Sequence, residues 1–251
     1  MKVHTSQHNN EKRLTLTEHL IELRNRLIFA GVSFLLVFGV SYYFAENIYA
    51  FLVEPLIVIT QNSKMIYTGL GEAFFTYLKL ASFASILVTM PIFLWQIYGF
   101  IAPGLHTNEK KAVLPFMIFT PILFWIGVLF AYYVVFPVAW EFFVSFEQHD
   151  KLQVVLEARV AEYLSIVMHL MIAFGVAFEL PVLLMLLLKF DLISYQSLRE
   201  KRKYAIILFF IIAAIITPPD VFSQVALALP MVILYESVIL YGKFIYKTQG
   251  K

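Results

Sequence analysis

The chain has 251 residues, of which 61% are hydrophobic and only 14% charged, and its formal net charge is +2. With a mean hydropathy of +0.79 it is far more apolar than an ordinary soluble domain, so the composition predicts an integral membrane protein. The absence of cysteine excludes disulfides and thiolate chemistry. Residues 1–26 are polar and charged, so we expect no cleavable signal peptide.

Six apolar runs follow one another along the chain. A membrane-spanning helix needs about 20 mostly apolar residues, and these runs are continuously apolar, without the alternation typical of barrel strands. The sequence therefore predicts an all-α integral membrane protein with six transmembrane helices, forming a single polytopic domain over residues 1–251 with a cytoplasmic N-terminal segment, 1–26. The predicted spans are 27–44, 73–100, 113–137, 161–190, 204–217 and 225–246.

Basic residues gather on one side of these predicted spans. They lie before span one, between spans two and three, between spans four and five, and at the end of span six, and they include Arg24, Arg26, Lys110, Lys111, Arg199, Lys201, Arg202, Lys203, Lys243 and Lys247. The opposite loops are instead rich in carboxylates, such as Glu46, Glu54, Glu72, Glu141, Glu147 and Glu157. By the positive-inside rule, both termini are predicted to be cytoplasmic.

The predicted spans differ in length and regularity. The fifth run, 204–217, corresponds to only about 21 Å of helix, which is shorter than the roughly 30 Å hydrocarbon core. The second and fourth runs are long and contain Pro91 and Pro181, which favour a tilt or kink. We therefore expect a concave face, formed where the long helices tilt or kink, and a short fifth span.

Glu179 lies in the otherwise apolar stretch "AFELPVLLMLLLKF" of the fourth run, two residues before Pro181. A charged acidic residue near the centre of a spanning helix costs about 2.5–3.5 kcal/mol on the insertion scale, so the side chain must face protein or water. One interpretation is a protonated or hydrogen-bonded carboxyl that locks helix packing. The other is a polar point inside a functional cavity.

Two further carboxylates are expected at the cytoplasmic edge of the membrane. Glu22 lies in "TEHLIELRNRL", where a purely structural reading pairs it with Arg26 at i,i+4. Glu109 lies in "FIAPGLHTNEKK", where Pro103 and Gly104 end a helix and a carboxylate suits the start of the next. Carboxylates placed on a surface otherwise crowded with basic residues are well suited to bind arginines, whose guanidinium groups pair with them bidentately.

Four segments, "HLIELRNRL", "FIAPGLHTNEKK", "AFGVAFELPV" and "TPPDVFSQ", occur in this order across the six spans. Together they resemble the TatC family, the polytopic subunit of the bacterial twin-arginine protein translocase, over nearly the whole chain. The resemblance implies a curved helix wall with a concave face and short fifth and sixth spans. It also implies a receptor for the twin-arginine signal peptides of folded exported proteins. It also implies assembly with the single-span subunits TatA and TatB, contact with membrane lipids, a homo-oligomer in the receptor complex, and a multi-pass location in the bacterial cytoplasmic (inner) membrane.

The resemblance also assigns roles to individual positions. Glu22 and Glu109 match the carboxylates that receive the arginine pair, and Glu179 matches the intramembrane glutamate of the concave face. The neighbours implied for the signal-peptide site are His19, Arg24, Phe100 and Pro103. Pro55 matches a sensitive proline of the first outer loop, and Asp220 lies in the "TPPD" turn. Thr217 and Gln224 are the expected contacts for a partner helix, although the preceding Ala213, Ala214 and Ile215 make that region more apolar than the family pattern.

An alternative of another class is an ion-coupled secondary transporter that uses Glu179 and Lys79 in a relay. The lack of an inverted repeat and the scarcity of paired intramembrane charges weigh against it. An enzyme is not expected, because the sequence contains no His-Glu-x-x-His motif, no Gly-x-Ser-x-Gly motif and no cysteine nucleophile. We expect no metal, no cofactor and no nucleic-acid partner.

Overall fold

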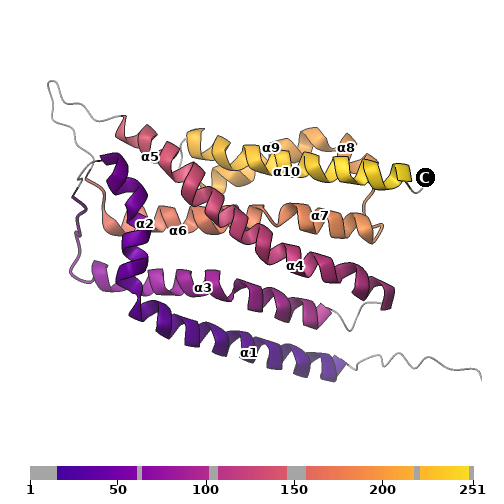
Figure 1. Ribbon diagram of the computed structural model, residues 1–251, viewed down its shortest axis with the longest axis horizontal. Helices are drawn as coiled ribbons and strands as arrows, with labels where there is room; N and C mark the ends of the chain where they lie inside the picture. The colour runs from indigo at the N-terminus through magenta and orange to yellow at the C-terminus, as the bar shows by residue number, and fades with distance from the viewer. Residues whose placement is uncertain (1–15, 61–63, 102–106, 146–156, 218–220, 249–251) are drawn as a thin grey trace, which may run out of the picture.

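The computed structural model describes residues 16–60, 64–101, 107–145, 157–217 and 221–248, and helices make up most of this part of the chain (Figure 1). The β pairing in this described part is one isolated bridge, between Ile66 and Arg159. The helices are α1 (Leu16–Tyr43), α2 (Ala45–Thr60), α3 (Glu72–Ile101), α4 (Thr107–Phe130), the π-helical turn η2 (Ala131–Val135), α5 (Phe136–Val144), α6 (Val160–Ala177), α7 (Leu180–Lys189), α8 (Tyr195–Glu200), α9 (Arg202–Ile216) and α10 (Val221–Thr248).

Five helical segments of the described chain are long and apolar enough to cross a membrane: Thr17–Tyr43, Glu72–Phe100, Val113–Val144, Val160–Lys189 and Val221–Phe244. They overlap predicted spans one to four and six, so the prediction of an all-helical, multi-pass membrane protein is confirmed. The expectation of a short sixth span is wrong, because α10 holds 28 residues and contains one of the five long apolar segments. The predicted fifth span corresponds to α9, whose 15 residues give about 22 Å of helix. The crossing of α9, and with it the count of six spans, remains a prediction.

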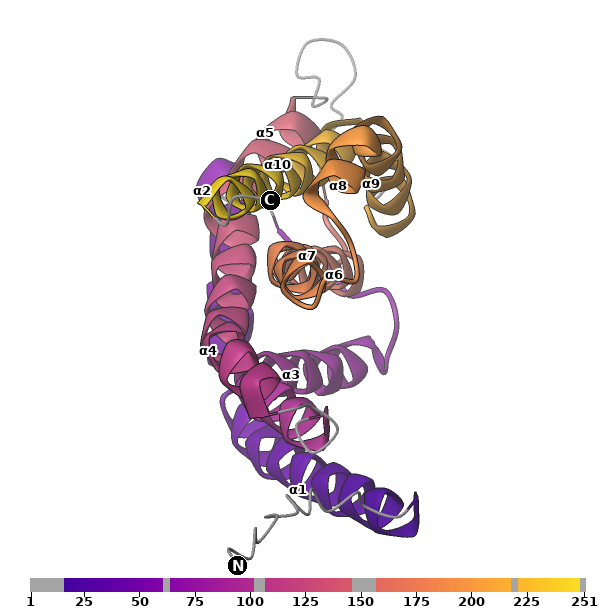
Figure 2. The ribbon, with the colours of Figure 1, turned by 90° about the vertical axis from the view of Figure 1, so that its right-hand side faces the viewer.

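The helices follow an arc. In Figure 2 the arc runs from α1 through α3 and α4 to α10 and α9, and α6 and α7 lie on its inner side. Figure 1 shows that the start of α1 and the end of α10 lie at the same end of the bundle. The basic residues of α8 and the start of α9 lie at this end, whereas the α2 and α5 segments lie at the other.

The first outer connection differs from the expected loop, because Pro55 lies inside helix α2. The helix holds only 16 residues with two glutamates and a proline, so counting apolar runs overlooks it. Proline at position 55 cannot donate to the carbonyl of Phe51 one turn earlier. In the structure the Tyr132 hydroxyl donates to that oxygen at 2.7 Å, and the Tyr163 hydroxyl donates to the next carbonyl, that of Leu52, also at 2.7 Å.

The fourth predicted span is broken near its middle. Helix α6 ends at Ala177 and α7 begins at Leu180 with Pro181 in its first turn, a position that proline favours because the missing N–H is not needed there. Two glycines bring α6 close to α4 just before the break. A Cβ at Gly127 would collide with the Phe174 carbonyl, and one at Gly175 would collide with the Phe124 ring. This close crossing sets the inner face on which Glu179 lies.

Candidate functional site

Glu22 and Arg26 form an ion pair on the first turns of α1. The Nη2 and Nε atoms of Arg26 donate to the same carboxylate oxygen, Oε1 of Glu22, at 2.6 and 3.0 Å. Both side chains are about one quarter exposed. The i,i+4 pairing expected from the sequence is therefore confirmed, and the segment that bears it is the beginning of the first long helix.

Helix α3 completes the surroundings of the Arg26 guanidinium. The Nη1 atom donates to Oε1 of Gln96 at 3.4 Å. A Cβ at Gly99 would collide with the same guanidinium, so only a residue without a side chain lets Arg26 lie this close to the α3 backbone. An open cavity of about 530 Å³ adjoins this pair and is lined by Glu18, Ile21, Glu22, Asn25, Arg26, Phe29 and Gln96. The Glu22–Arg26 pair thus lines an open groove between α1 and α3.

The other residues predicted for this site have different outcomes. The His19 ring stacks on Phe100 with centroids 4.2 Å apart, which joins α1 to α3 beside the groove. Arg24 is exposed and contacts its neighbour Asn25 at 3.3 Å. Glu109 lies in the first turn of α4, as expected for a helix start, but its side chain is outside the described part of the structure. Pro103 also lies outside the described residues.

Glu179 lies at the break between α6 and α7. Its carboxyl faces Thr120 and Phe124 of α4, and its Oε1 atom is buried without a hydrogen-bond partner among the described residues. Glu179 also lines an almost wholly apolar cavity of about 550 Å³ formed by α6, α7, α9 and α10. The carboxyl is therefore a polar group at the wall of an apolar cavity, and its role stays a prediction.

Lys79, the second residue of the transporter alternative, lines a different cavity between α3 and α6. His169 is the titratable residue that lines both cavities. Lys79 and Glu179 thus line different cavities, and no ion pair joins them in the described part of the chain, so the structure does not favour the relay that this alternative invokes.

The polar residues expected to contact a partner helix are engaged within the chain. The Thr217 hydroxyl donates to the carbonyl of Ala213 at 2.9 Å, and Thr217 is buried. The Gln224 amide donates to the carbonyl of Phe210 at 3.1 Å and so ties α10 to α9. Asp220 lies outside the described residues.

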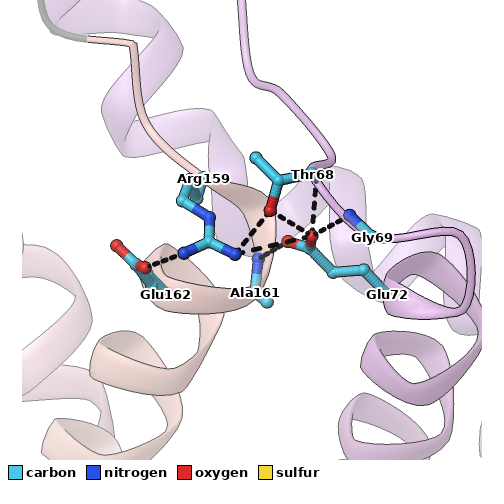
Figure 3. Close-up of polar contacts among 6 residues, drawn as sticks. All are labelled: Thr68, Gly69, Glu72, Arg159, Ala161 and Glu162. Atoms are coloured by element: carbon cyan, nitrogen blue, oxygen red, sulfur yellow. Dashed lines mark hydrogen bonds and ion pairs between the residues drawn. The ribbon is translucent and has the colours of Figure 1, made fainter.

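A polar cluster that the sequence analysis did not single out joins the start of α3 to the start of α6 (Figure 3). This end of the bundle is opposite to the start of α1 (Figure 1). Oε2 of Glu72 accepts hydrogen bonds from the backbone N–H groups of Thr68 and Gly69, at 2.8 and 3.0 Å, and from the Thr68 hydroxyl. Arg159 donates to the same hydroxyl and lies 3.8 Å from Glu72. The Ala161 N–H donates to the other carboxylate oxygen at 3.4 Å. This cluster fastens the 64–71 connection to the start of α6.

Sequence reasoning missed Gln96, Gly99 and the Glu72 cluster. The sequence offers a reason to single out Gln96, because it is a lone amide within an apolar predicted span. Nothing in the spacing of Glu72, Thr68 and Arg159 reveals that segments about 90 residues apart meet.

The fold and site define a polytopic helical membrane protein with the Glu22–Arg26 ion pair in an open groove at one end and a polar carboxyl, that of Glu179, on its concave side. The family model described as "Sec-independent protein translocase protein (TatC)" matches residues 18–230. The chain therefore belongs to the TatC family and is a subunit of a twin-arginine translocase, a transport component rather than an enzyme.

Similar proteins agree with this assignment. The Sec-independent protein translocase protein TatC of Rickettsia prowazekii is 45% identical over 93% of this chain and 94% of its own length. That of Magnetococcus marinus is 46% identical over 96% of this chain and 88% of its own length. That of Escherichia coli K12 is 40% identical over 94% of this chain and 90% of its own length. A crystal structure described as "Twin Arginine Translocase Receptor- TatC in DDM" superposes with a TM-score of 0.79 at 37% identity, covering 90% of this chain and 99% of that one.

Proposed function

We propose that this chain is the receptor that binds twin-arginine signal peptides of folded cargo proteins. The observation that carries the proposal is the groove in which Glu22 already holds a guanidinium, that of Arg26, through two N–H donors. An arginine of a signal peptide offers the same planar fork of donors, and a lysine does not. Glu109, in the first turn of α4, is proposed as the second carboxylate of the site.

The proposal includes a competition between two arginines. Both hydrogen bonds of Arg26 use the single oxygen Oε1 of Glu22. A peptide arginine can therefore pair bidentately with Glu22 only if Arg26 shares that oxygen or leaves it. Oε2 of Glu22 offers a second acceptor, and Gln96 can retain Arg26 while the peptide binds. His19 and Phe100, stacked beside the groove, offer an apolar surface for the residues that follow the arginine pair.

We propose six membrane crossings, with both termini on the cytoplasmic side of the bacterial inner membrane. The placement of the start of α1 and the end of α10 at one end of the bundle supports an even number of crossings (Figure 1). The excess of Lys and Arg at that end supports the orientation. Single cysteines can be introduced cleanly because the chain has none. An impermeant thiol reagent should label Lys64→Cys in intact cells, and labelling only after lysis would refute this topology.

We propose that the exposed side of α9 receives a single-span partner helix of the TatA or TatB type. A short helix is a favourable neighbour for a longer one, because the bilayer beside it must thin. Leu208, Ile211 and Ile215 project from α9 away from the rest of the chain, and the small residue Ala214 lies on the same exposed side. The engagement of Thr217 and Gln224 within the chain supports a partner contact based on shape more than on hydrogen bonds.

For Glu179 we propose a role in the depth to which a signal peptide or partner helix inserts, since it is a polar point beside a large apolar cavity. The transporter alternative is not favoured. Vesicles that contain this chain alone should move no small solute, and Glu179→Gln should leave binding at Glu22 largely unchanged.

The receptor proposal is tested by comparing two peptides on the purified protein. A signal peptide with Arg-Arg should bind, and the same peptide with Lys-Lys should bind at least about tenfold more weakly, because two charge-assisted bidentate contacts are lost. Equal binding of the two peptides would overturn the proposal.

A further inference from the structure

A polar cavity of about 330 Å³ lies between α3 and α6, at a distance from the signal-peptide groove. Its polar lining consists of Lys79 and Ser82 on α3 and of Ser165 and His169 on α6. The remaining lining is apolar and includes Phe83, Ile86, Met168 and Ile172. A lysine and three hydrogen-bonding side chains thus share this wall with apolar side chains that suit hydrocarbon.

Lys79 lies within the membrane-spanning segment Glu72–Phe100 and has no carboxylate partner in the described part of the chain. The ion pairs found there are those of Glu22 with Arg26, Glu72 and Glu162 with Arg159, and Glu236 with Arg202. A cation in a spanning helix needs a counter-charge or water, and the neighbours of Lys79 in the cavity supply no negative charge. An anion from outside this part of the chain can supply that counter-charge.

His169 adds hydrogen-bonding capacity to the same wall. Its Nδ1 atom lies 2.6 Å from the carbonyl oxygen of Ser165. A carbonyl oxygen can only accept, so Nδ1 carries the proton and donates. The other ring nitrogen, Nε2, then donates to an anion when the ring is protonated, or accepts from a hydroxyl or ammonium group when it is neutral. Both forms complement a phosphodiester that carries a polar headgroup.

The depth of the cavity matches a lipid headgroup better than a soluble anion. Lys79 lies about 10 Å along α3 from Glu72, and His169 lies about 12 Å along α6 from Ala161. Glu72 and Ala161 contact each other at one end of the bundle, so the cavity lies just inside that end. A lysine stem can reach towards the membrane interface from such a position, and the apolar lining can receive acyl chain.

We propose that this cavity binds the phosphate of a membrane phospholipid through Lys79, with Ser82, Ser165 and His169 around the headgroup and the apolar lining against the acyl chains. The proposal does not depend on the signal-peptide function or on the orientation of the chain. It assigns Lys79 a lipid contact in place of a role in an ion relay.

The test uses the full chain in non-ionic detergent with an environment-sensitive fluorophore on Ile86→Cys, the label being unique because the chain has no cysteine. Titration with short-chain phosphatidylglycerol should give a saturable signal. Lys79→Met should weaken this binding at least about tenfold, whereas Lys79→Arg, which keeps the charge, should retain it. Lys64→Met, which removes a cation from the 64–71 connection and does not line the cavity, is the matched control and should bind as the unsubstituted chain does.

Two further ligands separate the sources of the signal. Diacylglycerol with the same chains should give no saturable response, since it lacks the phosphate, and inorganic phosphate should give none at lipid concentrations, since it lacks the chains. Equal binding to the Lys79→Met and unsubstituted chains would overturn the proposal. An equal response to diacylglycerol would reduce the cavity to an apolar site, and an equal response to inorganic phosphate would make it a free-anion site; either result would contradict a phospholipid site.

Discussion

The hydroxyl of Tyr132 donates a 2.7 Å hydrogen bond to the carbonyl oxygen of Phe51, and the two rings stack with centroids 4.4 Å apart. Phe51 lies one turn before Pro55, so its carbonyl cannot receive the N–H that an ordinary helix would provide. Tyr132 belongs to the π-helical turn η2, a local irregularity that re-aims side chains. A side chain from the π-helical turn thus supplies the hydrogen bond that Pro55 of α2 cannot donate.

This match predicts a coupling between Pro55 and Tyr132. Tyr132→Phe keeps the stacked ring and removes the hydrogen bond, which should destabilise the protein by about 1 kcal/mol and lower Tm in detergent by roughly 2–4 °C. In the Pro55→Ala background, the restored backbone N–H at this position can donate to the Phe51 carbonyl, so the same substitution should cost clearly less. Tyr133→Phe, at an exposed neighbouring position, is the control and should change little. An equal cost of Tyr132→Phe in both backgrounds would disprove the coupling.

The Glu72 cluster predicts where the 64–71 connection opens. Glu72→Gln replaces a carboxylate that accepts four hydrogen bonds with an amide whose NH₂ group opposes some of the same donors. Amide hydrogen exchange at Thr68 and Gly69 should then accelerate roughly tenfold or more. Glu162→Gln, which removes the more exposed partner of Arg159, should leave these amides protected. Unchanged exchange in the Glu72 variant would show that the connection is held by other contacts.

Two adjacent alanines on α9 allow the partner proposal to be tested. Ala213 is fully buried within the chain and Ala214 is exposed. Ala214→Leu should reduce site-specific crosslinks to a TatA-like or TatB-like helix without changing Tm, because only an outside neighbour is obstructed. Ala213→Leu should instead overpack the fold at a cost of about 1–3 kcal/mol. If Ala214→Leu leaves the crosslinks intact, the partner helix does not pack on this side of α9.

Arg26 is predicted to compete with the signal peptide for Glu22. Arg26→Gln removes the internal guanidinium, so an Arg-Arg peptide should bind several-fold more tightly, and its preference over a Lys-Lys peptide should persist. The pair is partly exposed, so the internal contact is weak enough to be exchanged. Weaker peptide binding in Arg26→Gln would mean that Arg26 orients Glu22 and does not compete for it.

The sequence predicts the long elements well, because a continuous apolar run of about 20 residues seldom forms anything except a membrane-spanning helix. It also predicts the Glu22–Arg26 pair, because i,i+4 neighbours meet in any helix. It does not predict α2, because 16 residues that include Pro55 resemble a loop. In the structure, the Phe51 carbonyl that the proline leaves without a backbone donor accepts a hydrogen bond from Tyr132.

Contacts between distant segments are the part that single-sequence reasoning could not supply. Gln96 and Gly99 lie on α3, and only the crossing of α1 and α3 brings them to Arg26. Likewise, Thr217 and Gln224 resemble free partner contacts in the sequence. In the structure their donors are used by carbonyl groups of α9 itself.

The central claim, that the Glu22 carboxylate pairs with a signal-peptide arginine, is tested most directly by a double-mutant cycle between protein and peptide. Binding of Arg-Arg and Lys-Lys peptides is measured to the unsubstituted chain and to Glu22→Gln, with Glu162→Gln at the opposite end as control. We expect a coupling energy of about 1–3 kcal/mol between Glu22 and the arginine pair, and none for Glu162. Effects of Glu22→Gln and Arg→Lys that add within about 0.5 kcal/mol would contradict it.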